Sequence, residues 1–331
     1  MPTSPSVPAL IPLSLLDLMT SVVPFIAGWI GMYIGYQEIG YWFSLCLAPL
    51  TAGFLLRTFI VFHDCTHGSF MPTKRANQIV GAITGLLVWT PFARWRHQHA
   101  VHHGSAGDMD RRGTGDVHTL TLSEYQALSS KGRLAYRLFR NPLVMFTIGP
   151  IYSMMVMPRF VPKDARPRLR HSVILTNIAL AITIAVVCFV VGPWAFFIIE
   201  GPVLLLAGMA GVWLFYVQHQ FEDAYWERSD GWSYADAALR GSSYLKLPQP
   251  FQWFTGNIGL HHVHHLSAKV PNYYLQAAHD NNEVFHDVPV LTAKDTAKCV
   301  RFKVIDDDTG RLLTWAEVRR MNAAQPAAVG G

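Results

Sequence analysis

Long apolar stretches separated by short links dominate the chain. Residues 15–36 and 41–62 form one closely spaced pair, and residues 172–191 and 194–217 form a second. Each stretch has about 20 residues, which is the length that an α-helix needs to cross a bilayer. The link inside each pair is very short and carries no Lys or Arg. The pattern therefore predicts four transmembrane helices arranged as two hairpins.

The remaining chain divides into shorter segments. Residues 79–92 and 143–157 are apolar but too short to span, which favours interfacial or re-entrant helices. The predicted fold is an all-α integral membrane protein whose interfacial helices and helical cap surround the two hairpins. We predict an irregular segment over 1–13, one domain over 14–285 and a C-terminal tail over 286–331. The sequence Thr314-x-x-Glu317 resembles a helix capping box, and residues 323–331 are expected to be disordered.

Composition supports membrane insertion. The chain is 51% hydrophobic and only 15% charged, whereas soluble domains average about 25% charged residues. Basic residues follow the second apolar stretch, which places that end and the cap on the cytoplasmic face. The expected location is a bacterial inner membrane, or an endoplasmic reticulum or plastid membrane in a eukaryote. The four cysteines show no C-x-x-C spacing, no cleaved signal peptide is evident, and no nucleic-acid motif occurs.

Histidines concentrate in three short motifs. The first has an i, i+4 pair at the end of the second apolar stretch, and the other two have the spacing H-x-x-H-H. On a helix, residues with these spacings share one face. Neutral imidazole is the commonest protein metal ligand, so the motifs predict a metal centre. Its candidate ligands are His63, His67, His99, His102, His103, His261, His264 and His265.

A ninth candidate comes from the repetition of the hairpins. His219 follows the fourth apolar stretch as His63 follows the second. Eight or nine nitrogen ligands exceed the four that one tetrahedral metal takes, so the number favours two metals. Imidazole suits Zn, Cu, Fe and Ni alike. At the mouth of a membrane bundle the substrates are lipids, and attack on an unactivated C–H bond with O2 is the reaction most in need of two redox metals.

These motifs, with two hairpins between them, resemble the membrane fatty-acid desaturases. The similarity covers about residues 40–280, and the segments 62–70, 110–116 and 252–266 look most like the acyl-lipid, omega-6/Δ12-type branch. The resemblance implies two iron ions on the nine histidines and O2 as co-substrate. It also implies a fatty acyl lipid or acyl thioester as substrate, within membrane lipids. The chain lacks the H-P-G-G haem signature, so the electron donor must be a separate ferredoxin or cytochrome b5 with its reductase.

The outer contacts of the site are less constrained by the pattern. Carboxylates often hold the free N–H of a ligating histidine, which makes Asp64 and Asp116 candidates. Some relatives carry an Asn four residues before the lone histidine that reaches one iron through water. Phe215 occupies that position here, so Asn257 is the candidate for this contact. His97 and His262 fall off the ligand spacing and are expected to be exposed. The predicted acyl tunnel is lined by Trp213, Phe215 and Tyr216.

Two other functions compete with a desaturase. Fatty-acid hydroxylases and terminal-alkene-forming decarboxylases share the histidine architecture, and spacing alone does not separate their outcomes. A membrane metal transporter or sensor belongs to a different class and predicts ionisable residues at mid-depth. Between Thr20 and Leu56 the only such residue is Glu38, at a predicted turn. Residues 172–191 contain none, and the fourth apolar stretch contains only Glu200, near its outer end. A transport path is therefore poorly supported.

Overall fold

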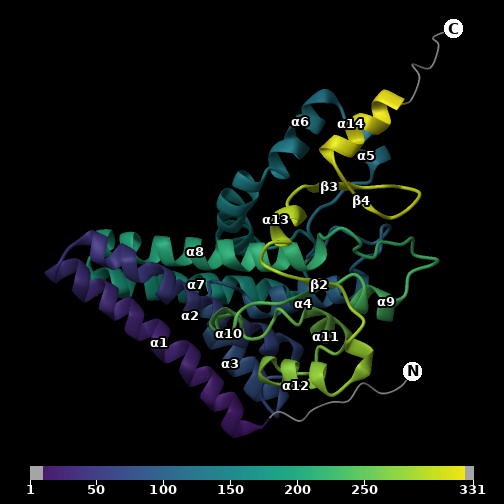
Figure 1. Cartoon of the computed structure of the whole chain (residues 1–331). Helices are drawn as coiled ribbons and strands as arrows, with labels where there is room; N and C mark the ends of the chain where they lie inside the picture. Colours follow the sequence, from purple (N-terminus) through teal and green to yellow (C-terminus); the bar gives the residue numbers. More distant parts are fainter. Residues whose placement is uncertain (1–9, 325–331) are drawn as a thin grey trace.

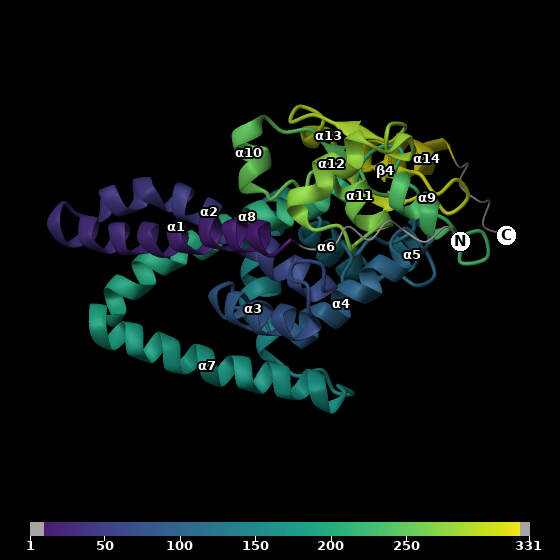
Figure 2. The ribbon, with the colours of Figure 1, turned by 90° about the horizontal axis from the view of Figure 1, so that it is seen from below.

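The computed structural model describes residues 10–324 and is mostly helical. Its four long helices are each long and apolar enough to cross a membrane, which confirms the four predicted spans. They are α1 (Ile11–Glu38), α2 (Tyr41–His67), α7 (Pro167–Val191) and α8 (Pro193–His219). Figures 1 and 2 show both hairpin turns at one end of the molecule and the shorter elements gathered at the other end as a cap.

The long helices extend further than the apolar pattern predicted. Helix α1 starts at Ile11 inside the segment expected to be irregular, whose residues 1–9 lie outside the described part. It also continues through Glu38, so the turn falls at Ile39 and Gly40. Helix α2 runs on to His67 and ends at Gly68, whose positive φ of 67° suits a residue without a Cβ. Both histidines of the first motif therefore lie on the last turns of a membrane helix.

The hairpins are unequal in burial. In α7 only Val173 and Leu180 are buried, and Phe189 is 91% exposed. In α2 the second half is almost entirely buried, because α1, α3 and α8 pack around it. An apolar helix with an exposed surface suits contact with lipid chains, whereas α2 forms the centre of the bundle.

Residues 74–105 form two helices. The apolar segment predicted over 79–92 is interrupted: α3 (Lys74–Leu87) stops before Pro91, and α4 (Phe92–Ser105) begins after it. Pro91 cannot donate a backbone hydrogen bond, so it suits the residue just before a helix. The second apolar segment forms η1 (Val144–Ile148), η2 (Ile151–Val156) and η3 (Met157–Arg159). Helix α4 brings the second histidine motif under the cap.

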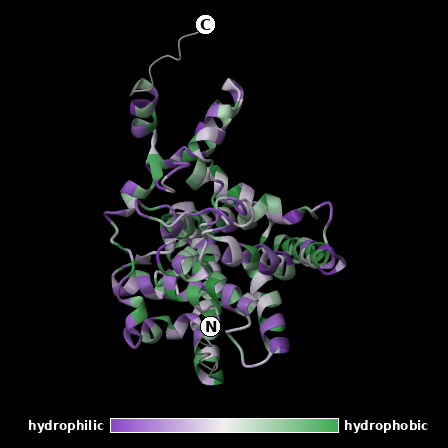
Figure 3. Cartoon of the chain, turned by 90° about the vertical axis from the view of Figure 1, so that its right-hand side faces the viewer, coloured by the Kyte–Doolittle hydropathy of each residue, from purple (hydrophilic) through white to green (hydrophobic). Residues whose placement is uncertain are grey.

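Short elements build the cap, and Figure 3 shows apolar and polar positions mixed along them. Two small sheets were not predicted, because strands of two to four residues carry too little alternation to be recognised. One is parallel (β1 with β2) and the other antiparallel (β3 with β4). The cap elements are α5 (Leu122–Ala127), α6 (Ser130–Phe139), α9 (Tyr234–Leu239), β1 (Tyr244–Leu245), α10 (Gln249–Phe254), α11 (His261–Leu266), η4 (Asn272–Tyr274), α12 (Leu275–Asp280), η5 (Glu283–Phe285), β2 (Val290–Leu291), α13 (Thr296–Cys299), β3 (Phe302–Ile305), β4 (Leu312–Thr314) and α14 (Trp315–Ala324).

The C-terminal residues pack into the cap. Phe302, Ile305 and Leu312 share one apolar core with Leu214 and Val217 of α8. The predicted capping box is confirmed, since Thr314 and Glu317 bond each other's backbone N–H groups. Helix α14 includes residues 323 and 324, where disorder was expected; the rest of that tail lies outside the described residues. The boundary at residue 285 stays a prediction.

A fully buried arginine ties this C-terminal part to α8. The Arg140 guanidinium donates to Gln220 Oε1 (2.8 Å), to the backbone oxygen of Phe302 (3.0 Å) and to the Tyr216 hydroxyl (3.2 Å). Buried charge is costly unless its hydrogen bonds are satisfied, so these acceptors fix the relative positions of α6, α8 and β3. The cap is thereby held over the end of the membrane bundle where the histidines lie.

Candidate metal centre

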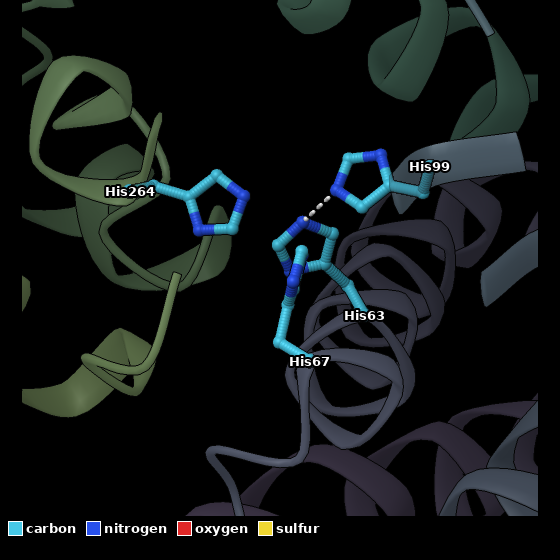
Figure 4. Close-up of side chains that lie close together, drawn as sticks. All are labelled: His63, His67, His99 and His264. Carbon is cyan, nitrogen blue, oxygen red and sulfur yellow. Dashed lines mark hydrogen bonds between the residues drawn. The ribbon is translucent and has the colours of Figure 1, made fainter. Parts of the chain in front are cut away.

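Four histidines from three helices form the first histidine set: His63 and His67 of α2, His99 of α4 and His264 of α11. One ring nitrogen from each lies within 4.8 Å of the others. Figure 4 shows the four rings converging, with His63 Nε2 only 2.9 Å from His99 Nε2. Three of these side chains are buried, and His67 is half-buried.

A second histidine set lies beside the first: His102 of α4, His219 of α8, and His261 and His265 of α11. Its nitrogens also lie within 4.8 Å of one another, and all four residues are buried. His219 Nε2 is 2.9 Å from His261 Nε2 and 3.2 Å from His102 Nε2. The structure thus brings the lone histidine of α8 together with both H-x-x-H-H motifs.

Each H-x-x-H-H motif is divided between the two sets. His99 and His102 differ by about 60° around the axis of α4, because three residues at 100° each fall short of a full turn. They therefore point to different sets, as His264 and His265 do on α11. Helical spacing identified the residues but could not show this division, which depends on where the neighbouring helices lie.

His103 is the one predicted ligand outside both sets, and it lies between them. Its Nε2 is 3.1 Å from His99 Nε2, and its ring centroid is 4.6 Å from that of His264. On the other side it stacks on His265 at 4.2 Å. All nine predicted histidines therefore meet in one region.

Hydrogen bonds on the far ring nitrogens orient several of these histidines. The Asp64 carboxylate lies 3.0 Å from His63 Nδ1, and the Asp116 carboxylate contacts His102 Nδ1. The Gly241 carbonyl oxygen lies 3.1 Å from His219 Nδ1. Because carboxylates and carbonyls accept hydrogen bonds, they place the proton on Nδ1 and leave an Nε2 lone pair facing each set. The Gly241 contact had no signal in the sequence, since any residue supplies a carbonyl.

Burial keeps five histidines of α4 and α11 neutral. Loss of hydration is the largest cause, and the neighbouring imidazoles are the second. Together they hold the pKa values of these residues well below the usual range. Two further nitrogens, His67 Nε2 and His264 Nε2, are buried without a hydrogen-bond partner. Neutral imidazoles whose lone pairs face each other repel, and a cation between them removes the repulsion. The donor set therefore fits two transition-metal ions. The five histidines with lowered pKa are His99, His103, His261, His264 and His265.

The predicted outer residues have different surroundings. Asp64 and Asp116 contact histidines, but the Asn257 side chain donates to the backbone oxygen of Asn272 at 3.1 Å, with no histidine among its partners in the described chain. His97 is exposed as expected. The expectation for His262 was wrong: it is fully buried, with its Nε2 3.0 Å from His279 Nδ1. Packing against His279 therefore buries a histidine of α11 that belongs to neither histidine set.

The predicted tunnel residues do not share one surface. Phe215 packs against His102 and His219, with ring centroids 5.0 and 5.2 Å away. Tyr216 bonds to Arg140, and Trp213 packs against the cap core. An apolar pocket lies elsewhere, lined by Leu55, Leu56, Phe59, Val88, Trp89, Met154, Met155, Leu204, Ala207 and Gly208. Phe59 packs on Trp95, which stacks on His99 at 4.2 Å, so this pocket lies toward the first histidine set.

The chain is similar to fatty acid desaturases. A family model described as fatty acid desaturase matches residues 40–290. A protein from Bacillus subtilis named "Fatty acid desaturase" is 44% identical over 313 residues, covering 95% of this chain and 89% of the relative. Two Synechocystis proteins are more distant. An "sn-1 oleoyl-lipid 12-desaturase" is 27% identical, covering 74% of this chain and 71% of its own length. An "sn-1 acyl-lipid omega-3 desaturase (ferredoxin)" is 28% identical, covering 75% and 70%.

The family match covers every histidine of both sets and three of the four membrane helices, α2, α7 and α8. Together with the relative that aligns over nearly the whole chain, it agrees with the four membrane helices and the buried histidine sets. The chain belongs to the fatty acid desaturase family of membrane oxidoreductases.

Proposed function

We propose that this protein is an acyl-lipid desaturase that uses O2 and two iron ions to introduce a double bond into a fatty acyl chain. The observation that carries the proposal is the pairing of two buried histidine sets at the end of a membrane bundle. Imidazole-only sites also suit other metals. Iron is proposed because the chain belongs to an oxidoreductase family whose reaction consumes electrons.

The ligands would divide as the geometry divides the histidines. The first histidine set, with His103 added, would hold one ion, since His103 approaches His99 and His264. The second histidine set would hold the other. Asp64, Asp116 and the Gly241 carbonyl would keep the ligating nitrogens free of protons by fixing the far N–H. Outer partners of this kind set metal affinity as well as ring orientation.

The reaction balances with a separate electron donor. The bound ions would supply the reduction of O2, which takes up four electrons and four protons to give two water molecules. Two electrons and two protons come from adjacent CH2 groups of the acyl chain. The other two electrons come from a donor such as ferredoxin or cytochrome b5, and the other two protons come from water. A Synechocystis relative carries ferredoxin in its name. The chain's own contribution is to exclude water, to hold the imidazoles neutral and to hold the acyl chain.

We propose a cytoplasmic position for the cap and a bacterial inner membrane for the helices. Exposed basic residues follow α2 and precede α7, at the same end of the bundle as the cap. Lys and Arg near the ends of membrane helices favour the cytoplasmic side. This orientation would give a soluble electron donor access to the histidine sets.

The acyl chain is proposed to lie in the apolar pocket between α2, η2 and α8. Its lining is almost entirely aliphatic and aromatic, and apolar surface favours the burial of methylene groups by about 0.8 kcal/mol each. Trp95 separates Phe59 of this pocket from His99. We propose this pocket in preference to the surface that the sequence predicted around Trp213, Phe215 and Tyr216, of which Phe215 contacts the second histidine set.

Filling the pocket should reduce activity without removing metal. Ala207→Phe would add a ring to the lining, and losing room for three or four methylenes would cost about 3 kcal/mol of binding, or roughly a hundredfold in kcat/KM. The matched control is Leu205→Phe, a partly exposed position on α8 outside the pocket. Turnover and metal content are measured on both purified proteins. Unchanged turnover in Ala207→Phe would place the acyl chain elsewhere.

Gas chromatography–mass spectrometry of a host expressing the protein tests the function itself. The expected result is a new internal double bond in the total acyl chains, located by derivatisation, that disappears in the His264→Ala variant. A hydroxy acid or a volatile terminal alkene in its place would keep the metal site but assign a sister activity. If supplying ferredoxin and its reductase still yields no product, the desaturase proposal fails and the metal transporter or sensor returns.

A further inference from the structure

A buried polar network connects the first turns of α1 to the first histidine set. It contains Asp17 of α1, Arg57 and Asp64 of α2, and Asn272 of η4, and each of these residues is at most 6% exposed. The network joins three parts of the chain that are far apart in sequence. Asp17 also lies outside residues 40–290, which the family model matches.

Asn272 fixes the orientation of the Asp64 carboxylate. Asp64 Oδ2 accepts from the Asn272 backbone N–H at 2.7 Å and from its side-chain amide at 3.0 Å. The other oxygen, Oδ1, is thereby left for His63 Nδ1, which lies 3.0 Å away. Any rotation of the carboxylate would break contacts on both sides, so the ring of His63 depends on the position of Asn272.

Asp17 in turn holds the Asn272 amide. The same Nδ2 group donates to Asp17 Oδ2 at 2.9 Å, and the other Asp17 oxygen pairs with the Arg57 guanidinium. Arg57 also donates to the backbone oxygen of Trp253, which anchors the pair to the cap. One amide therefore bridges two buried carboxylates, and α1 supplies the outer one.

The network contains more acidic groups than basic ones. Among residues 10–324, Arg57 is the only Lys or Arg side chain that pairs with either carboxylate. The two carboxyl groups thus share one guanidinium, which pairs with Asp17. The cation nearest to Asp64 would be a metal ion bound by His63, whose Nδ1 lies 3.0 Å from Asp64 Oδ1.

The first turns of α1 are fastened beside this network. The Ser14 hydroxyl donates to the backbone oxygen of Phe70 at 2.6 Å and lies 3.0 Å from the Tyr273 hydroxyl. Phe70 follows the first histidine motif, and Tyr273 is the neighbour of Asn272. Helix α1 is thus built onto the segments that carry the metal-site contacts.

We propose that Asp17 is a positioning residue for the first metal site, acting on His63 through Asn272 and Asp64. The inference rests on the proposed function, because it requires His63 to bind a metal. Loss of an outer partner of a metal ligand lowers metal affinity by about 10- to 100-fold. Asp17 acts through two further residues, so we expect Asp17→Asn, which keeps the shape of the side chain, to produce a loss at the lower end of that range, about 10-fold, at one site only.

The test measures Co²⁺ affinity by chelator competition on the full chain in detergent. In a His261→Ala background the first histidine set is intact, and in a His264→Ala background the second is intact. Asp17→Asn should weaken Co²⁺ binding about 10-fold in the first background, with a changed cobalt absorption spectrum, and leave it unchanged in the second. Asn272→Ala, which keeps the backbone N–H to Asp64, should act in the same way and replaces Asp17→Asn if that variant does not fold.

Trp29→Phe is the matched control, because it removes a different contact of α1 and so tests whether a general loosening of this helix lowers Co²⁺ affinity. Trp29 Nε1 donates to Glu200 of α8 at 2.9 Å and has no histidine of either set among its partners. It should leave Co²⁺ affinity unchanged in both backgrounds. Three results would overturn this inference and leave the proposed function intact. They are equal losses of Co²⁺ affinity in both backgrounds, a loss with Trp29→Phe, and an unchanged affinity with Asp17→Asn. Failure of the wild-type chain to bind two Co²⁺ ions would overturn the proposed function and this inference together.

Discussion

The purified His261→Ala protein is expected to hold one metal ion per chain where the wild-type protein holds two, and to form no measurable product. His261 supplies one of the four nitrogens of the second histidine set, and its Nε2 lies 2.9 Å from His219 and 3.1 Å from His265. Truncation leaves three buried imidazoles in this set. Because a metal contributes several kcal/mol to transition-state stabilisation, its loss should cost on the order of a thousandfold in rate or more.

The structure also predicts which ion remains. His261→Ala should leave the first histidine set loaded, and His264→Ala should leave the second loaded, since the sets share no member. The matched control is His97→Ala, because His97 is an exposed histidine on α4. It should retain two ions and full activity. Metal analysis by mass spectrometry together with turnover provides the measurement. Two ions retained in His261→Ala would contradict the assignment of the second site.

The metal-free protein is expected to lose stability steeply as the pH falls below about 6.5, the ordinary pKa of histidine. Burial lowers the pKa of five histidines of α4 and α11 in the folded protein, so the unfolded chain binds more protons than the folded chain below that pH. The free energy of unfolding therefore falls as the pH falls. Each histidine contributes about 1 kcal/mol between pH 6.5 and 5.5, which gives a combined loss of several kcal/mol.

Denaturation in detergent between pH 5.5 and 8 measures this dependence. Metal loading should shift the loss of stability to lower pH, because metal ions compete with protons for the same nitrogens. His265→Ala in the metal-free state should show a shallower slope, since one buried histidine is absent, while the exposed His97→Ala should keep the wild-type slope. A stability that stays level or rises on acidification would mean that these imidazoles accept protons inside the fold.

The membrane architecture could be predicted because hydropathy acts over whole helices. Four stretches of about 20 apolar residues have few stable structures other than membrane spans. His219 was found by the parallel between the two hairpins rather than by its neighbours in sequence. The capping box at Thr314 was also predictable, because the capping contacts are local.

Contacts between distant segments could not be predicted. The division of each H-x-x-H-H motif depends on how α4 and α11 are turned against α2 and α8. The Gly241 carbonyl and the Asn272 amide act through tertiary position, and a single sequence contains no trace of such pairing. His262 was misjudged for a related reason: spacing excluded it as a ligand, but packing against His279 buries it.

A single-turnover experiment tests the central account most directly. The iron-loaded protein is reduced, freed of reductant, mixed with acyl lipid and exposed to one pulse of O2, and the double bonds formed per chain are counted by mass spectrometry. Of the four electrons that O2 takes up, the acyl chain gives two and the reduced protein gives two. The account predicts up to one double bond per protein molecule. It predicts none without O2, without iron or in the His261→Ala variant. Double bonds formed by the metal-free protein, or in the absence of O2, would contradict it.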